Sequence, residues 1–367
     1  MTFESRHALN AVCPYFTMFP LEFPYRILGR SPKRATVLDP FCGRGTTNYA
    51  ARSLKVASYG IDSSPIAVAI ARAKLAQATE EEVLDLLEVL LEDEGEITVP
   101  AGAFWEHAYH PETLIQLCRL RKGLSDRRSD AANLLRGVVL GCLHGPQPKN
   151  PESAGYFSNQ MPRTFASKPD YSVRYWEKHR LQARNVDVRL PISRKLARIF
   201  GDEIPVPKNM GAIRRGDSTR ANSYAHVPDS LSHVITSPPY YGLVTYVEDQ
   251  WLRHWFLGGP DSIEYGNRVQ LSHRSPEEFS RTLARVWDHC GDHLATSGIM
   301  AVRFGSIRSR DKDPKTILRQ SLRLSKHHWR VTSERDVGTA ASGKRQADLM
   351  GTISAPTNEY DFRSRPA

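Results

Sequence analysis

The residue types best suited to chemistry lie in a glycine-bearing segment near the start of the chain. DPFCGRGTT, residues 39–47, follows a short apolar run that predicts a strand and precedes a run that predicts a helix. Glycines at such a junction permit a tight turn and close approach of a ligand to the backbone, and the helix N-terminus favours negative charge. The lysine of a phosphate-binding P-loop is missing, so ATP chemistry of that kind is disfavoured.

An acidic residue ends a second strand a short distance along the chain. The segment ASYGID, residues 57–62, predicts a strand that ends at Asp62, 19 residues after Gly43. A carboxylate at about that spacing suits the two hydroxyls of a ribose. The glycine turn and the acid together predict a nucleoside cofactor, which from the residues alone is either NAD-like or S-adenosylmethionine (SAM). A bare strand–helix turn is the simpler interpretation of each part taken alone.

Five segments together resemble the amino-directed DNA methyltransferases, which methylate the exocyclic amine of cytosine or adenine. DPFCGRGTT resembles the first motif of that family, GIDSSP the second, Gly216-Asp217-Ser218 the third and ITSPPY, residues 235–240, the catalytic motif. CPYFTMFPLEFPYRIL, just before the first strand, is similar to the segment that covers the methionine part of SAM. The resemblance spans residues 13–75 and 210–305, with the motifs in sequence order.

The proline-bearing motif can assist methyl transfer to a base amine. The lone pair of such an amine is delocalised into the ring, so an enzyme helps by accepting hydrogen bonds from the amino hydrogens and by holding the methyl donor in line. Ser237 offers a hydroxyl acceptor, and Pro238 offers a carbonyl in a loop that Pro239 stiffens. Tyr240 offers a ring on which a flipped base can stack. The resemblance implies these roles for the serine, the first proline and the aromatic residue.

The choice of target atom follows from two features of the sequence. Serine at the first position of the motif, in place of Asp or Asn, resembles the cytosine-N4 members more than most adenine-N6 members. Methylation of cytosine C5 is disfavoured because it needs a cysteine nucleophile after a proline, and none of the five cysteines follows one.

The resemblance also implies which residues hold the cofactor. Asp39 and the backbone of the glycine turn are expected at the methionine part of SAM, Asp62 at the ribose and Asp217 at the adenine amine. The full set of expected cofactor-binding residues is Tyr15, Phe16, Met18, Asp39, Phe41, Gly43, Gly45, Thr46, Thr47, Asp62, Ser63, Asp217 and Ser218. The three residues before position 20 are equally compatible with an apolar segment that packs on the sheet.

Strands that alternate with helices predict an α/β fold with a doubly wound, mainly parallel sheet. The resemblance implies the Rossmann-like class I methyltransferase sheet, with a C-terminal β-hairpin and a mostly helical insertion. We expect residues 1–99 to form the N-terminal half of the SAM-binding core, 100–210 the basic helical insertion, and 211–367 the half with the catalytic motif. The acidic run Glu80–Glu96, with nine carboxylates among leucines, predicts the exposed face of an amphipathic helix.

Positive charge gathers in the middle of the chain. The net charge is +10, and residues 119–198 hold 17 Lys and Arg against 6 Asp and Glu, so the rest sums to −1. Such a concentration favours a polyanionic partner, nucleic acid first, although a solvated basic surface is the plain alternative. We expect residues 100–210 to hold the target-recognition region. The residues expected to contact DNA are Arg163, Phe165, Lys168, Arg174, Lys344 and Arg345.

The sequence therefore predicts a site-specific enzyme that transfers a methyl group from SAM to N4 of a cytosine flipped out of double-stranded DNA, with no metal. Adenine-N6 methylation of DNA and methylation of an RNA base amine stay open, as does a non-enzymatic nucleic-acid-binding protein that retains SAM. With no apolar stretch long enough to span a membrane, no apolar signal segment and no CxxC pair, we expect a cytoplasmic protein. The target sequence, the choice between monomer and homodimer, and a cognate restriction endonuclease are left open.

Overall fold

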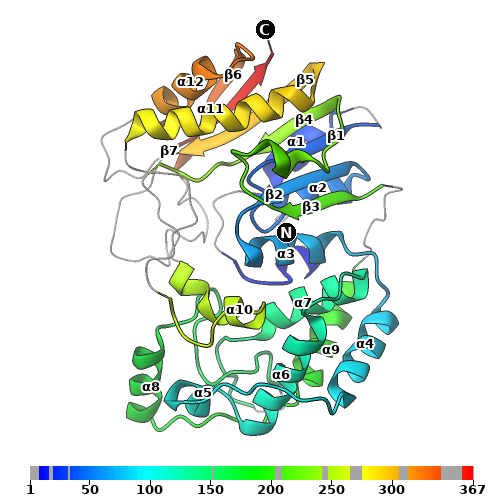
Figure 1. Cartoon of the computed structure of the whole chain (residues 1–367), viewed down its shortest axis with the longest axis vertical. Helices are drawn as coiled ribbons and strands as arrows, with labels where there is room; N and C mark the ends of the chain where they lie inside the picture. Colours follow the sequence, from blue (N-terminus) through cyan, green and yellow to red (C-terminus); the bar gives the residue numbers. More distant parts are fainter. Residues whose placement is uncertain are drawn as a thin grey trace. The chain divides into compact units, whose positions relative to one another are not determined.

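The chain folds into two compact units. The structure, a computed structural model, describes residues 8–15, 20–31, 34–150, 153–202, 209–241, 247–264, 275–305, 313–339 and 358–366. The sheet unit comprises Phe16–Ala71, Pro205–Thr245 and Val269–Ala367, and the helical unit comprises Met1–Tyr15, Arg72–Ile204 and Tyr246–Arg268. Each unit is therefore assembled from segments that lie far apart in the sequence (Figure 1).

The sheet unit is built on seven strands in the order β3-β2-β1-β4-β5-β7-β6. The strands are β1 (Thr36–Asp39), β2 (Ala57–Asp62), β3 (Gly211–Arg215), β4 (Leu231–Thr236), β5 (Leu294–Gly305), β6 (Arg330–Thr339) and β7 (Asn358–Arg365). The first five pair in parallel, and β7 runs antiparallel to both β5 and β6. The predicted fold class, a mainly parallel doubly wound sheet with an antiparallel hairpin at the C-terminus, is confirmed.

Neighbouring residues of one strand serve different cores because successive side chains of a strand point to opposite faces. Val37 and Ile235 belong to a core with residues of α1 (Glu22–Leu28) and α2 (Thr46–Ser53). Leu38 and Val234, each one residue away, belong to a core with α11 (Pro276–His293) and α12 (Pro314–Leu324). Helices thus cover both faces, and α11 and α12 lie together on one of them (Figure 1).

Local sequence signals explain where several helices begin. α3 (Pro65–Leu75) starts with a proline at its first position, and the Ser64 hydroxyl accepts a hydrogen bond from the Ala67 amide at 3.3 Å. Ser275 caps α11 in the same way through the Glu278 amide at 3.1 Å. Serine followed by proline, a pattern typical of helix starts, occurs at both positions.

The helical unit contains the expected run of helices after residue 100. Its helices are α4 (Glu80–Glu92), α5 (Ala103–Ala108), α6 (Pro111–Leu124), α7 (Asp130–Cys142), α8 (Pro169–Lys178), α9 (Arg189–Phe200) and α10 (Trp251–Phe256), with short 3₁₀ turns η2 (Ala8–Ala11) and η5 (Val247–Gln250). A further 3₁₀ turn, η4 (Ala221–Tyr224), belongs to the sheet unit. The segment of α10 lies 50 residues beyond α9 in the sequence. Local sequence patterns do not predict that it joins the helical unit.

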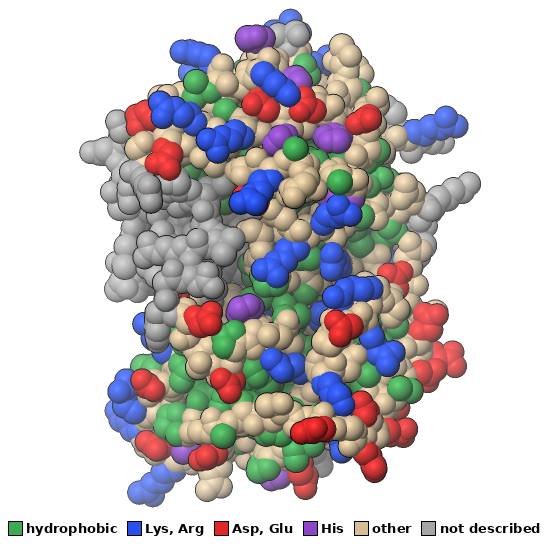
Figure 2. All heavy atoms as spheres, viewed as in Figure 1, with side chains coloured by type: hydrophobic (Ala, Val, Ile, Leu, Met, Phe, Trp, Pro, Cys, Tyr) green, Lys and Arg blue, Asp and Glu red, His purple; other side chains and the backbone are tan. Residues whose placement is uncertain are grey.

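The acidic run forms an amphipathic helix, as predicted. Its start carries a capping box in which the Thr79 hydroxyl accepts from the Glu82 amide and the Glu82 carboxylate accepts from the Thr79 amide. Val83, Leu87 and Leu90 are buried on its inner side. Acidic side chains, red in Figure 2, project from its outer side. In the part of the chain that the structure describes, no helix is both long and apolar enough to cross a bilayer.

Candidate functional site

Three neighbouring strand ends bring the sequence motifs together. β1 pairs with β2 on one side and with β4 on the other, so Asp39, Asp62 and Thr236 end adjacent parallel strands. The chain leaves β1 toward β2 and β3 on one side, and later fills the other side with β4 and β5. In open α/β sheets, ligands bind outside the carboxyl ends of the strands where the strand order reverses in this way. The candidate site is this edge of the sheet unit.

The glycine turn is fastened to the acid at the end of β2. The Gly43 amide donates to Asp62 Oδ2 at 2.9 Å, and the Ser64 amide donates to Asp62 Oδ1 at 2.8 Å. Within the turn, the Gly45 amide donates to the Cys42 carbonyl at 2.7 Å. Burial raises the pKa of Asp62 above its ordinary value, although the two amide donors oppose that rise. The carboxylate therefore stays fixed beside the turn, with backbone donors around it.

The two glycines of the turn are required for different reasons. Gly45 has φ 74° and Gly43 has φ 50°, a left-handed conformation that other residues adopt at a cost. A Cβ at Gly45 would lie 2.9 Å from both Cα and Cβ of Ala71 in α3. A Cβ at Gly43 would meet no atom within 4 Å. The first glycine therefore leaves open space above the backbone, and the second permits close packing of the turn on α3.

We expect Gly45→Ala to destabilise the protein more than Gly43→Ala. The Gly43 variant bears only the cost of the left-handed backbone, about 1–2 kcal/mol. The Gly45 variant adds a collision with helix backbone and should lose about 3 kcal/mol or more of the free energy of unfolding. Urea unfolding of both variants beside the unchanged protein measures the difference. Equal losses would contradict this account of the turn.

A buried carboxylate links β1 to β4. The Thr236 hydroxyl donates to Asp39 Oδ1 at 2.6 Å, and the Phe41 amide donates to the same oxygen at 3.1 Å. Asp39 is 2% exposed. Burial raises its pKa to about 6, because loss of hydration outweighs the hydrogen bonds from Thr236, Thr47 and Phe41 that lower it. A buried carboxyl with a raised pKa at the strand ends is a candidate functional group.

The proline-bearing motif follows β4 directly. Ser237 and Pro239 are partly exposed, whereas Pro238 is buried. Tyr240 is 3% exposed, and its hydroxyl donates to Glu359 Oε1 at 2.7 Å. Burial, together with the Glu359 carboxylate, raises the pKa of Tyr240 well above its ordinary value. The stacking of a base on Tyr240 stays a prediction.

Buried charged residues of β5 and β7 surround the hydroxyl of Tyr240 and its partner Glu359. Arg303 binds Asp361 through two hydrogen bonds, at 2.6 and 2.9 Å, and lies 3.9 Å from Glu359. The Tyr240 ring packs edge-on against Phe304 with a centroid distance of 5.8 Å. The motif after β4 is therefore braced by the C-terminal hairpin of the sheet unit.

The other predicted cofactor residues of the sheet unit are spread around the same strand ends. The Ser218 hydroxyl donates to the Pro40 carbonyl, and the Thr47 hydroxyl donates to the Ile235 carbonyl at 3.3 Å. Phe41 packs edge-on against Trp287 at 6.5 Å, and Thr46 is buried at the start of α2. The Ser63 carbonyl accepts from Arg215 at 3.3 Å. Asp217 lies in an exposed turn, where it accepts from the Thr219 amide and hydroxyl at 2.9 and 2.7 Å.

Four predicted residues fall where nothing can be said of their structure. Phe16, Met18, Lys344 and Arg345 lie outside the described residues. Tyr15, the remaining residue of the N-terminal segment, belongs to the helical unit and is partly buried. Their predicted roles stay predictions.

The predicted DNA-contacting residues before α8 lie on a loop that a buried arginine fixes. Arg253 of α10 is fully buried and donates to the carbonyls of Arg163 and Thr164 at 2.8 and 3.1 Å, and to that of Leu140 at 3.2 Å. Further along the loop, the Ala166 amide donates to the Asp249 carbonyl at 2.8 Å. The Arg163 and Lys168 side chains remain exposed, while Phe165 is partly buried. A fixed backbone with exposed cations suits contact with an anionic ligand.

Several residues of the site are not apparent from sequence. Thr236 lies inside the predicted motif ITSPPY, next to Ser237, but no role was expected for it. Arg303, Glu359 and Asp361 carry no motif, and Glu359 lies 119 residues from Tyr240. Among the described residues, no group of three or more His, Cys, Asp or Glu side chains is arranged to hold a metal ion.

A family model described as DNA methylase matches residues 3–73, which span the segment before β1, the glycine turn, β2 and most of α3. No curated protein matches the chain.

Three solved structures illustrate the level of structural likeness. An rRNA methyltransferase, aviRa, from Streptomyces viridochromogenes has 13% identity and a TM-score of 0.30, with 96% of this chain and 87% of that chain covered. An rRNA methylase from Streptococcus thermophilus has 8% identity and a TM-score of 0.33, with 94% and 96% covered. A geranyl diphosphate methyltransferase in complex with SAM has 8% identity and a TM-score of 0.35, with 95% and 84% covered. Likeness at this level leaves the substrate of this chain open.

Proposed function

We propose that the protein is a SAM-dependent DNA methyltransferase that methylates the N4 amine of cytosine. The observation that carries the proposal is the 2.6 Å hydrogen bond from Thr236 Oγ1 to Asp39 Oδ1. It joins the glycine turn to the proline-bearing motif, two segments that lie 197 residues apart in the sequence. A cofactor motif and a catalytic motif that meet at one sheet edge form the arrangement that methyl transfer requires. The match of residues 3–73 to the DNA methylase model supports the same reaction.

The residues at the strand ends fit SAM by the chemistry of their donors and acceptors. The backbone at Gly43 faces open space, which is room for a ligand against the turn. Asp62 supplies a carboxylate for the ribose hydroxyls, and Asp39 supplies one for the amino group of the methionine part. Asp217, exposed beyond β3, supplies an acceptor for the adenine amine. The bound cofactor would contribute a methyl group activated by the sulfonium and, once the carbon–sulfur bond breaks, would leave as a neutral thioether.

The motif after β4 is assigned the work on the target base. The Ser237 hydroxyl and the Pro238 carbonyl accept hydrogen bonds from the amine, which draws the nitrogen toward tetrahedral geometry. Tyr240, whose hydroxyl is held by Glu359, fixes the loop that presents them. No covalent enzyme intermediate is needed, since the nitrogen takes the methyl group directly and the proton it loses passes to solvent. The base must leave the duplex for this, and basic residues of the helical unit would hold the phosphates.

Methyl transfer from labelled SAM to unmethylated double-stranded DNA and, separately, to bulk RNA tests the proposal, with nucleoside mass spectrometry of each digest. N4-methylcytosine in DNA is the expected product. N6-methyladenine would keep the mechanism and overturn the choice of base, and label in RNA alone would overturn the choice of nucleic acid. Binding of SAM with no transfer to a genomic mixture of DNA would favour a non-enzymatic nucleic-acid-binding protein.

We expect Ser237→Ala to lower kcat about 100-fold or more while SAM affinity changes less than threefold, because the hydroxyl acts on the base and not on the cofactor. Steady-state methyl transfer at saturating substrate and equilibrium dialysis with SAM measure the two quantities. Ser333→Ala, which removes an exposed hydroxyl from β6, is the matched control and should leave both unchanged. Full activity in the Ser237 variant would remove this residue from the proposed mechanism.

A further inference from the structure

An exposed row of aromatic and basic side chains on α8 has no role in the chemistry at the sheet edge. Tyr171, Arg174, Tyr175 and Lys178 recur at the spacing i, i+3, i+4, i+7, which places them on one face of the helix. All four are exposed, with Tyr171 at 59% and Tyr175 at 37%. These four residues are called the α8 stripe below.

The opposite face of α8 fixes which side chains meet water. Trp176 is 1% exposed, its indole N–H donates to the Gln160 carbonyl at 2.7 Å, and its ring lies 5.6 Å from that of Phe104 in α5. Ser172, one turn earlier, is buried on the same side. The helix cannot rotate about its axis without exposing this tryptophan, so the stripe is held toward solvent.

The aromatic rings of the stripe form a short stack. The rings of Tyr171 and Tyr175 have centroids 6.5 Å apart and planes within 17° of each other. His179, which follows the helix, lies 4.5 Å from the Tyr175 ring. Tyrosine on the water-facing side of a helix gains nothing from the core, whereas flat rings in a row suit stacking with planar ligands.

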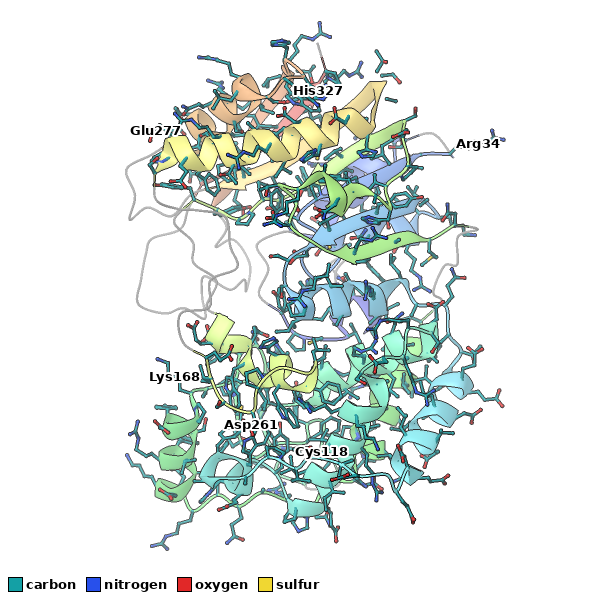
Figure 3. The ribbon with its side chains drawn as sticks, viewed as in Figure 1. Arg34, Cys118, Lys168, Asp261, Glu277 and His327 are labelled. Carbon is teal, nitrogen blue, oxygen red and sulfur yellow. The ribbon has the colours of Figure 1, made fainter. Side chains whose placement is uncertain are left out.

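Charge around the stripe favours an anionic partner. Residues 163–184 contain six Lys and Arg against two acids, Asp170 and Glu177. Glu177 lies 3.8 Å from His107, and the exposed Lys168 directly precedes α8 (Figure 3). Basic side chains, blue in Figure 2, project from this part of the helical unit. Rings that offer stacking, placed one turn from cations, match the two features of a single nucleic-acid strand.

We propose that the α8 stripe binds single-stranded DNA, with unpaired bases stacked on Tyr171 and Tyr175 and phosphates held by Arg174 and Lys178. The choice of DNA rests on the proposed function, while the binding itself needs neither cofactor nor catalysis. A duplex keeps its bases stacked on one another and offers the rings no free base face. The stripe therefore prefers single strands, and through it the protein binds DNA whose bases are unpaired.

Fluorescence anisotropy of the full chain, without SAM, tests this with a labelled thymidine homopolymer of about 20 nucleotides. We expect Tyr171→Ala with Tyr175→Ala to weaken binding about tenfold or more, and Tyr171→Phe with Tyr175→Phe to retain it, because the ring and not the hydroxyl stacks. Ile115→Ala, which removes another exposed apolar side chain of the helical unit, is the control and should have no effect.

Salt dependence separates stacking from charge. Arg174→Gln with Lys178→Gln should reduce the slope of log affinity against log salt by about 1.4, which is about 0.7 for each lost phosphate contact, whereas the tyrosine-to-alanine changes should leave the slope unaltered. An equal loss of duplex and single-strand affinity in the alanine pair, an equal loss in the phenylalanine and alanine pairs, or no single-strand binding by the unchanged protein would each overturn the proposal. Tighter binding of the matching uridine homopolymer would overturn the choice of DNA.

The experiments distinguish failure of the α8 stripe proposal from failure of the proposed function. Methyl transfer to duplex DNA that persists when single-strand binding is insensitive to the tyrosines would leave the function standing and remove the stripe. Single-strand binding that depends on the tyrosines, in a protein that transfers no methyl group, would support the α8 stripe and overturn the proposed function.

Discussion

Replacing Asp39 by Asn should raise the free energy of unfolding of the ligand-free protein at pH 7 while it weakens SAM binding. The carboxyl is buried, and its pKa is raised from the ordinary 3.8 to about 6. Such a rise means that the ionised carboxylate lowers the free energy of unfolding at neutral pH by up to about 3 kcal/mol. Asn is neutral and can still accept the hydrogen bond from Thr236, so the cost disappears while the local geometry is kept.

The stability difference between the Asn variant and the unchanged protein should depend on pH. Because the folded-state pKa of Asp39 lies above the unfolded value, the folded protein binds the proton more tightly. The resulting stability is fully present below about pH 4 and is lost as the pH rises through about 6. The Asn variant should therefore exceed the unchanged protein most at pH 7–8, and the difference should shrink as the pH falls toward 4.

Urea unfolding across this pH range, with SAM titration in parallel, measures both effects of the Asp39 change. Loss of a charge-assisted hydrogen bond to the cofactor should weaken SAM binding roughly 10- to 100-fold. Asp261→Asn, at an exposed position of the helical unit, is the control for removal of one negative charge (Figure 3). An Asn variant that is less stable than the unchanged protein at pH 7, or that binds SAM equally well, would contradict the role given to Asp39.

The part of the site that could be predicted from sequence is the part encoded locally. The strand before Asp39, the glycine turn and the strand that ends at Asp62 follow one another within 28 residues, so periodicity and turn residues suffice to find them. The parallel order of strands then brings β4 beside β1, and the motif at Ser237 follows its strand. The fold class was predictable for the same reason, since alternating helices and strands leave few topologies.

What sequence could not predict depends on contacts between distant segments. The partner of Tyr240 is a glutamate in the last strand, where no local pattern distinguishes Glu359 from a surface residue. The tyrosines of α8 and its tryptophan are equally aromatic, yet burial of Trp176 against α5 leaves Tyr171 exposed. The segment around α10 joins the helical unit although it follows the catalytic motif, because its arginine finds the carbonyls near residue 163.

Replacing Arg303 by Met should cost about 3–5 kcal/mol of the free energy of unfolding, the largest loss expected from a single change in the sheet unit. Arg303 is 6% exposed and is bonded to Asp361 at 2.6 and 2.9 Å, with Glu359 at 3.9 Å. Its guanidinium also lies 4.6 Å from the ring centroid of Phe23. Methionine fills similar space but removes the buried cation, so Asp361 keeps only the half-exposed Arg26 and Glu359 keeps the hydrogen bond from Tyr240. Buried carboxylates that lose their buried cation are strongly destabilising.

A second arginine on the same carboxylate supplies the control for the Arg303 change. Arg26 lies 3.6 Å from Asp361, but its side chain is 47% exposed, so Arg26→Met should cost no more than about 1 kcal/mol. Asp361→Asn added to the Arg303 variant should recover part of the lost stability, because it removes one of the two carboxylates that lost their buried cation. Urea unfolding of the unchanged protein, Arg303→Met, Asp361→Asn and the variant with both changes tests this as a double-mutant cycle, and Arg26→Met is measured beside them. Similar losses of the free energy of unfolding for the two arginines would show that burial does not set the size of the loss. The buried charges of β5 and β7 could then not be what holds Tyr240 and, through it, the motif at Ser237.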